Sequence, residues 1–374
     1  MTIVAEHSAQ LWITGTLTYY EMTAFDLTRD QFSYPYIQGS VTIRTPDAAG
    51  LAKLDPRNKV RMSLQVNKSF LGDDPVPAQQ SRTLRLYLVK YEVDHAAQTT
   101  RLLLSSAETL LDDYRLMAAM PVRFPMTNVR GIVNSVLGRI GRALITGPAD
   151  SATVLETPEW TPGQSAWDYL TPILEASGRR LYVDEMDNFR LVPRIVAPVG
   201  NVDLVLGTSQ ITDATESLAL VQDYYDACII EYRWTNEFEE DERVRYDTAQ
   251  AGPTIRRVEH VVYEDTRYPG PGAARQRVNR SLTKGRQVDV SFVQDYLADP
   301  GYSATIELAE GVETAGYITA ITWKFPELEM SIATRDVVTV PRYAWIKAPV
   351  GLSWKEAPLQ MSWIESPTLF ETEA

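Results

Sequence analysis

Short runs of alternating apolar and polar residues dominate the first part of the chain. The runs "LWITGTLTYY", "KVRMSLQV" and "RTLRLYLVKYEV" place apolar side chains at every second position, which is the period of a strand with one buried face. The intervals between the runs carry Pro, Gly, Asn and Asp, which favour turns. The pattern therefore predicts an antiparallel sheet or barrel over residues 1–120.

The pattern changes at Pro121 and Pro125, because proline interrupts regular strands and helices. Thr127 is the expected cap of a helix that follows, and apolar residues recur on one face of this helix. A second helix and a hairpin come next. We therefore interpret residues 121–195 as an inserted α/β domain between two β-rich regions.

The second helix and the hairpin have clear boundaries. Ser165 is the expected helix cap, and Asp168 occupies the position that completes a capping box. Gly178 favours the end of the helix. Two short runs, 180–184 and 189–193, flank four turn-forming residues and predict two paired strands.

Strand-like runs return after this segment, among them "DACIIEYRW", "RQVDVSFVQ" and "AGYITAITWKF". They predict a second β region over 226–340, while residues 196–225 are expected to complete the first. One helix interrupts the second region. Ala274, Val278 and Leu282 are its expected buried face, because they recur at a spacing of four.

The last residues, 341–374, follow neither period and predict an extended arm. A nine-residue repeat lies within it, since "LSWKEAP" recurs as "MSWIESP". Burial of a large apolar side chain contributes about 2 to 3 kcal/mol, so we expect Trp354, Trp363 and Trp345 to dock on a neighbouring protein. The alternative is a hairpin folded back on the second β region.

Composition restricts the classes of function. With 36 basic and 49 acidic residues the net charge is −13, which argues against a protein that reads nucleic-acid sequence. The same sign suits a surface along which DNA passes without adhering. Cys228 is the only cysteine and is expected in a buried strand, so neither an intrachain disulfide nor a cysteine zinc site is possible. We find no export signal and no apolar run of membrane-spanning length.

Candidate catalytic groups are sparse. His7, His95 and His260 are scattered and lack metal-ligand spacing or a nearby nucleophile. The acidic runs "EFEEDE" at 237–242 and "VDEMDN" at 183–188 are interpreted as exposed turns, because neither has the spacing of a calcium loop. The sequence therefore predicts no catalytic, cofactor-binding or metal-binding residues and no enzyme activity.

Three passages carry a resemblance to a known family. They are "RTLRLYLVKYEVDHAAQTTRLLLSSAETLLDDYRL", "GQSAWDYLTPILEASGRRLYVDEMDNFRLVPR" and "AARQRVNRSLTKGRQVDVSFVQDYLADPGYSATIELAEGVETAGYITAITWKFPELEMSIATRDV". In the order of their elements they resemble the tail-hub proteins of tailed bacteriophages, which are related to baseplate hubs and to the hub part of type VI secretion spikes.

The resemblance implies an α+β, mainly β fold with two related antiparallel β-barrels, an inserted helix and hairpin domain and an extended C-terminal arm. It also implies a homotrimeric ring in the virion, at the distal tail tip, which adapts the sixfold tail tube to a threefold tip and borders the DNA channel. Its expected partners are a distal tail ring protein, a tape measure protein and tip or fibre proteins. The particle is assembled in the host cytoplasm.

Two other functions stay open at this point. Some tail-tip proteins carry a cell-wall hydrolase domain after the hub. The eight tryptophans and nineteen tyrosines also fit a carbohydrate-binding β protein, since such proteins stack sugars on exposed aromatic rings. Most of these aromatic residues lie within strand patterns, where core packing is the more common role.

Overall fold

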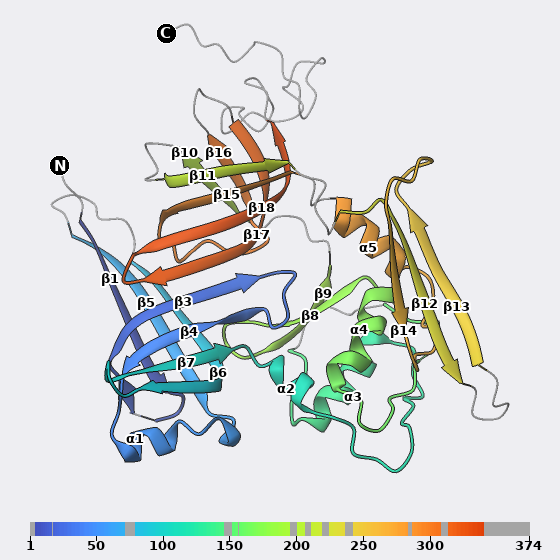
Figure 1. Cartoon of the computed structure of the whole chain (residues 1–374), viewed down its shortest axis with the longest axis horizontal. Helices are drawn as coiled ribbons and strands as arrows, with labels where there is room; N and C mark the ends of the chain where they lie inside the picture. Colours follow the sequence, from blue (N-terminus) through green and yellow to red (C-terminus); the bar gives the residue numbers. More distant parts are fainter. Residues whose placement is uncertain are drawn as a thin grey trace, which may run out of the picture.

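The structure is a computed structural model and describes residues 4–16, 18–71, 79–145, 152–155, 157–194, 200–205, 211–218, 224–235, 242–282, 286–307 and 313–339. The expected C-terminal arm lies outside these residues. The described chain is mainly β, as the sequence predicts. A large sheet, a segment of helices and a hairpin, and a smaller sheet can be followed in Figure 1.

The first half of the large sheet comprises the strands β1 to β7. They are β1 (Val4–Ile13), β2 (Tyr19–Tyr20), β3 (Met22–Asp30), β4 (Ile37–Arg44), β5 (Arg61–Leu71), β6 (Gln80–Asp94) and β7 (Thr99–Ser105). Short helical turns at Ala48–Lys53 (α1) and Pro56–Asn58 connect β4 to β5. All neighbours are antiparallel, in the order β3-β4-β7-β6-β5-β1-β2. The predicted alternation is confirmed on β5, where Met62, Leu64 and Val66 are fully buried.

The second half of the large sheet comprises six strands. They are β10 (Asn201–Val205), β11 (Ile211–Leu218), β15 (Arg286–Val293), β16 (Ser303–Glu307), β17 (Glu313–Phe325) and β18 (Glu329–Thr339). β10 pairs with β16 in parallel, and β11 pairs with β15. The expectation that 196–225 completes the first β region is therefore wrong for these two strands, because their backbone groups bond to the second half.

β17 joins the two halves by pairing with β3, so that Trp323 lies opposite Leu27 and Phe325 opposite Phe25. The two phenylalanine rings stack with centroids 5.7 Å apart. One hydrophobic core draws buried side chains from both halves. The described strands of the large sheet form one path that ends at β2 and β11, with β16 and β10 branching from β17, and not a closed ring. The expected pair of barrels therefore stays a proposal.

The inserted segment contains α2 (Thr109–Asp113), α3 (Val129–Arg139), α4 (Ala166–Ala176), β8 (Arg179–Val183) and β9 (Phe189–Pro193). It has a core of its own, in which Trp160 is fully buried. Ser165 caps α4 as predicted, because its Oγ accepts a hydrogen bond of 3.0 Å from the Asp168 backbone N–H. Gly178 follows the helix with a φ of +63°, which glycine adopts without a steric penalty.

The expected cap of α3 is wrong by one residue. Asn128 caps the helix, because its Oδ1 accepts a hydrogen bond of 3.0 Å from the Gly131 backbone N–H. The carbonyl of Thr127 instead accepts a hydrogen bond from the Val154 backbone N–H. Both residue types are good caps, so the tertiary contact with 152–155 decides which of them occupies the position.

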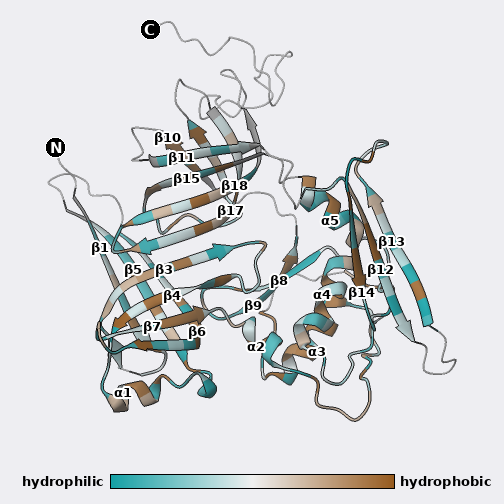
Figure 2. Cartoon of the chain, in the orientation of Figure 1, coloured by the Kyte–Doolittle hydropathy of each residue, from teal (hydrophilic) through white to brown (hydrophobic). Residues whose placement is uncertain are grey.

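A third unit stands apart from the large sheet. It consists of β12 (Ala227–Thr235), β13 (Glu242–Gln250), β14 (Val258–Tyr263) and α5 (Ala273–Leu282). β12 pairs with β13 antiparallel and with β14 in parallel. These strands were expected within the second β region, but they form a separate three-stranded sheet. Figure 2 shows its outer strand β13 largely in hydrophilic colours, in contrast to α4.

The helix α5 packs against this small sheet. Ala274 and Val278 are fully buried, as predicted, whereas Leu282 is 39% exposed because the helix ends at that residue. Asp247 of β13 fixes the other end, since its Oδ2 accepts hydrogen bonds from the backbone N–H groups of Gly272 and Ala274. The longest helices in the described part of the chain have 11 residues, and none there is long and apolar enough to cross a membrane.

Candidate functional site

Two arginines and two carboxylates meet where the large sheet contacts the inserted segment. Arg29 of β3 is 4% exposed and lies 2.9 Å from Glu185 and 2.5 Å from Asp299. Arg82 of β6 lies 2.6 Å from Glu185 and 2.7 Å from Asp299. Burial alone lowers the pKa of Arg29, but Tyr36 and the two carboxylates outweigh burial and raise it. The cluster links the first half, the second half and the β8–β9 turn.

The β8–β9 turn makes a second buried ion cluster. Asp187, with a side chain 3% exposed, accepts hydrogen bonds of 2.9 Å from Arg61 and 3.1 Å from Arg142. Arg142 also donates to the hydroxyl of Tyr87. Asp187 has a φ of +68°, a conformation that Asp tolerates better than most residues. The cluster attaches the turn to β5 and to the segment after α3.

Asp184 stabilises the same turn from within. Its Oδ1 accepts hydrogen bonds from the backbone N–H groups of Met186 and Asn188, and its Oδ2 accepts one of 2.6 Å from Arg190. The interpretation of this acidic run as a turn is therefore confirmed, but its expected exposure is wrong for Asp187, which is buried between arginines. Of the other acidic run only Glu242 is described, at the exposed start of β13, so the hairpin turn predicted there stays a prediction.

Glu175 of α4 connects the inserted segment to the third unit. Its Oε2 accepts hydrogen bonds of 3.1 Å from Arg277 Nε and Nη2 and one of 2.8 Å from the Tyr263 hydroxyl. Arg194 Nη1 lies 3.9 Å from the other oxygen. The inserted segment is thus held by charged groups on both of its sides.

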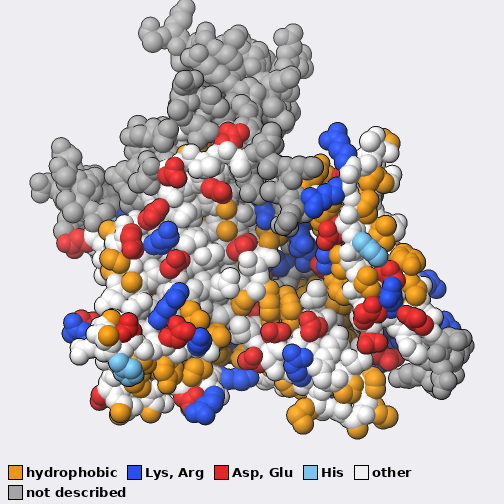
Figure 3. Space-filling model, viewed as in Figure 1, with side chains coloured by type: hydrophobic (Ala, Val, Ile, Leu, Met, Phe, Trp, Pro, Cys, Tyr) orange, Lys and Arg blue, Asp and Glu red, His pale blue; other side chains and the backbone are white. Residues whose placement is uncertain are grey.

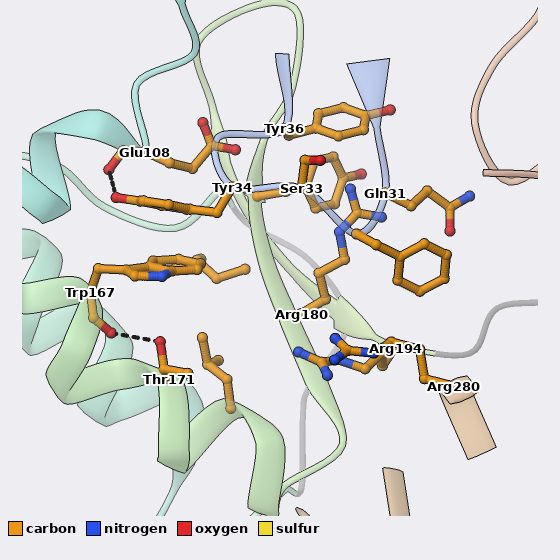
Figure 4. Close-up of a pocket in the computed structure, with 14 residues that line it drawn as sticks. Gln31, Ser33, Tyr34, Tyr36, Glu108, Trp167, Thr171, Arg180, Arg194 and Arg280 are labelled. Atoms are coloured by element: carbon orange, nitrogen blue, oxygen red, sulfur yellow. Dashed lines mark hydrogen bonds between the residues drawn. The ribbon is translucent and has the colours of Figure 1, made fainter. Parts of the chain in front are cut away.

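A cavity of about 80 Å³ lies beside the contacts of Glu175 and Arg194. Its lining side chains come from the β3–β4 loop, the start of α2, α4, β8, the end of β9 and α5. Those labelled in Figure 4 are Gln31, Ser33, Tyr34, Tyr36, Glu108, Trp167, Thr171, Arg180, Arg194 and Arg280. Trp167 stacks on Tyr34 with ring centroids 3.7 Å apart. Arg180 lies 4.7 Å from the ring centroid of Tyr36 and 4.6 Å from that of Tyr182.

Two arginines of the cavity each have a buried nitrogen without a hydrogen bond in the described part of the chain. Arg180 Nη2 and Arg194 Nη1 are buried and have no hydrogen-bond partner among the described residues. Burial lowers the pKa of Arg180. Burial also lowers the pKa of Arg194. Glu175 opposes this shift, whereas the neighbouring arginines increase it. The cavity therefore presents concentrated positive charge, and Figure 3 shows Lys and Arg side chains gathered in a hollow beside α5.

The residues singled out from the sequence are not brought together. Trp345, Trp354 and Trp363 lie outside the described residues, so their docking stays a prediction. His7 is half-buried and His95 is exposed.

His260 lies 3.1 Å from Glu231. No group of three or more His, Cys, Asp or Glu side chains suited to a metal occurs in the described part of the chain. Cys228 is buried as predicted, and burial raises its pKa to about 11.

Sequence reasoning missed the arginine cavity and the ion clusters. Arg180 and Arg194 border a predicted hairpin, whereas Arg277 and Arg280 belong to a helix about 90 positions further along the chain. Nothing in the local pattern indicates that the two elements meet. The available signal is the number of arginines on α5, which lie beside the buried positions Ala274 and Val278.

No family model matches this chain, and no curated protein matches it. Solved structures do match. A tail protein from Neisseria meningitidis MC58 is 12% identical, over 88% of this chain and 96% of that chain, with a TM-score of 0.56. The 43 kDa tail protein of prophage MuSo2 from Shewanella oneidensis is 13% identical, over 89% and 98% of the two chains, with a TM-score of 0.56.

A third match is the prophage tail protein gp18 from Listeria monocytogenes EGD-e, which is 9% identical, over 88% of this chain and 94% of that chain, with a TM-score of 0.51. At such identities the likeness establishes the fold. The resemblance to phage tail proteins is thereby confirmed at the level of the fold. The names of all three describe tail proteins and none describes an enzyme.

Proposed function

We propose that this protein is a structural hub at the distal tip of a phage tail. Three copies form a ring that adapts the sixfold tail tube to a threefold tip and borders the DNA channel. The observation that carries this proposal is the match to tail proteins along nearly their whole length, for example 96% of the Neisseria protein. A match of that extent includes the large sheet, the inserted segment and the third unit together.

The internal construction supports an adaptor role. The large sheet has two halves joined at β3 and β17, which suits a subunit that presents two similar surfaces around a ring. The domains that we propose are a first barrel over 1–120, an attachment domain over 121–195 and a second barrel within 226–340 that excludes the third unit and includes β10 and β11. The third unit then belongs to the attachment surface, because β12 to β14 pair with one another and not with the large sheet.

Exposed apolar side chains support attachment through the inserted segment. Met117 is 94% exposed, Met120 is 74% exposed and Leu155 is 64% exposed. Flexible apolar side chains such as methionine suit protein contacts. The partners that we propose are a distal tail ring protein, a tape measure protein and tip or fibre proteins, in the virion and after assembly in the host cytoplasm.

The net charge of −13 suits a channel through which DNA moves, because acidic side chains repel phosphates. Docking of Trp345, Trp354 and Trp363 on a neighbouring subunit completes the proposal. Neither a cell-wall hydrolase nor a sugar binder is favoured by an observation of the described residues. The exposed tyrosines there, Tyr19, Tyr246 and Tyr317, lie on three separate strands.

The proposal is tested on the assembled particle. Imaging of the tail should show threefold density at the end of the tube, and native mass measurement of the isolated tip should give three copies. A stable count of one, five or six copies contradicts the ring. Release of sugar or peptide from cell-wall fragments by the pure protein favours the hydrolase instead, and saturable retention without cleavage favours the sugar binder.

A further inference from the structure

The arginine-lined cavity has more positive charge than its own carboxylates compensate. Arg180 makes no ion pair among the described residues, and two tyrosine rings hold its guanidinium in place. Arg194 has one carboxylate at 3.9 Å, a distance too long for a hydrogen bond. That carboxylate, Glu175, already accepts from both Arg277 and Tyr263.

The other acidic side chains near the cavity are occupied or disfavoured as anions. The oxygens of Asp30 accept hydrogen bonds from the Phe32 backbone N–H at 2.8 Å and from Ser33 Oγ at 2.6 Å. Glu108 Oε1 accepts a hydrogen bond from the Val183 backbone N–H, whereas its buried Oε2 has no hydrogen-bond partner among the described residues. Burial raises the pKa of Glu108, which favours its neutral form.

Three neutral donors of the cavity wall are engaged. Gln31 Nε2 donates to the Ile318 carbonyl, Thr171 Oγ1 to the Trp167 carbonyl and the Tyr34 hydroxyl to the Glu108 carbonyl. The buried nitrogens of the lining that have no hydrogen-bond partner among the described residues are Arg180 Nη2 and Arg194 Nη1, and both side chains are drawn in Figure 4. A guanidinium binds carboxylate and phosphate oxygens in the plane of its N–H groups, often in pairs.

We propose that this cavity binds one small oxyanion, a carboxylate or a phosphate, between Arg180 and Arg194. A volume of about 80 Å³ admits several waters or one such anion, since one water needs about 10–15 Å³ on this scale. The anion replaces the missing hydrogen bonds of both arginines and links β8, which carries Arg180, to Arg194 at the end of β9. The site is independent of the tail-hub assignment, because it lies within one chain.

Calorimetric titration of the full chain with sodium phosphate, at an ionic strength held constant with sodium chloride, tests the proposal. We expect saturable binding of one phosphate per chain and a rise in Tm that chloride does not reproduce. Arg180→Gln should weaken binding at least about tenfold. Arg44→Gln is the control with the same change of charge, because Arg44 is a surface residue with a side chain 69% exposed, and it should bind as the parent does.

Two probes distinguish the sources of the anion. Binding of acetyl-Glu-Glu-Glu-amide, but not of acetyl-Gln-Gln-Gln-amide, in competition with phosphate identifies a carboxylate from a polypeptide as the occupant. Phosphate binding without peptide binding identifies the free ion. Absence of saturable binding for both probes overturns the proposal.

A second variant keeps the test valid if Arg180→Gln does not fold. Thr171→Asp places a carboxylate of similar size on the cavity wall. In phosphate-free buffer it should raise Tm, and it should weaken phosphate binding at least about tenfold, because the site then carries its own anion. A folded Thr171→Asp protein that has a lower Tm and binds phosphate with unchanged affinity contradicts the assignment.

Discussion

Arg82 on β6 and Asp299, 217 positions later, are joined by two hydrogen bonds of 2.7 Å from one guanidinium nitrogen to both carboxylate oxygens. Arg82 also donates to the carbonyls of Tyr296 and Ala298. The first half of the sheet thereby holds the loop that leads into β16. Arg29 pairs with the same carboxylate, so the loss of Asp299 should affect both arginines and lower the stability of the fold.

Replacement of Asp299 by Asn should destabilise the protein. The variant leaves Arg29 and Arg82 with one carboxylate, that of Glu185. Because Asp299 is partly exposed, we expect the free energy of unfolding to fall by about 2 to 3 kcal/mol, at the low end for loss of one partner of a buried ion pair. Urea denaturation measures this loss. Glu21→Gln is the control, since the Glu21–Arg44 pair is exposed on both sides, and a loss as large in the control would show that burial is not the cause.

Glu108→Gln should stabilise the protein at neutral pH and not in acid. Burial raises the pKa of Glu108 in the folded state, so its contribution to stability is fully present below the unfolded pKa of about 4.3. That contribution is lost as pH rises through the higher folded pKa. Glutamine keeps the acceptor for the Val183 N–H and carries no charge.

Urea denaturation at pH 4 and pH 8 checks this prediction. The variant should gain on the order of 1 kcal/mol over the parent at pH 8, and the difference should disappear at pH 4. Glu327→Gln provides the matched control, because Glu327 is exposed. An equal advantage of Glu108→Gln at both pH values would exclude ionisation of Glu108 as the source.

Deletion of residues 351–374 should leave a folded chain that attaches less well to neighbouring tail subunits. The expected cause is the loss of two tryptophans, each of which contributes about 2 to 3 kcal/mol when buried. Trp354→Ala and Trp363→Ala should each show part of the loss. Incorporation into tails is the measurement. The docking idea is wrong if the truncated chain unfolds, or if it is incorporated as well as the full-length chain.

Chelation should leave Tm unchanged. The described residues hold no cluster of three metal-ligating side chains, and the carboxylates of the β8–β9 turn are bonded to arginines and backbone N–H groups. Thermal unfolding with and without EDTA measures this. A decrease of several degrees in EDTA would reveal a metal that stabilises the folded state.

Several local features were predictable from the sequence for a common reason. The helix cap at Ser165, the end of α4 before Gly178 and the β8–β9 hairpin each depend on residues that are close in the sequence. Capping, left-handed turns and strand alternation are local effects. The buried strand positions on β5 follow from the same alternation.

Other features were decided only by the tertiary structure. The sequence places β12 to β14 among strands that look equivalent, because strand pattern does not specify the partner of a strand. The pairing of β10 with β16 and of β11 with β15 likewise joins residues about 70 to 100 positions apart. Only the packed fold determines which edges meet.

The sequence by itself determined the mainly β class, the insertion of a helix and hairpin segment, and a resemblance to tail proteins that holds for the fold. It did not determine the charged contacts that hold these parts together. Most arginines lie on exposed surfaces, so the sequence does not reveal which of them are buried in the fold. Arg180 and Arg194 become a candidate anion site because folding places Arg277 and Arg280 near them and concentrates positive charge around one cavity.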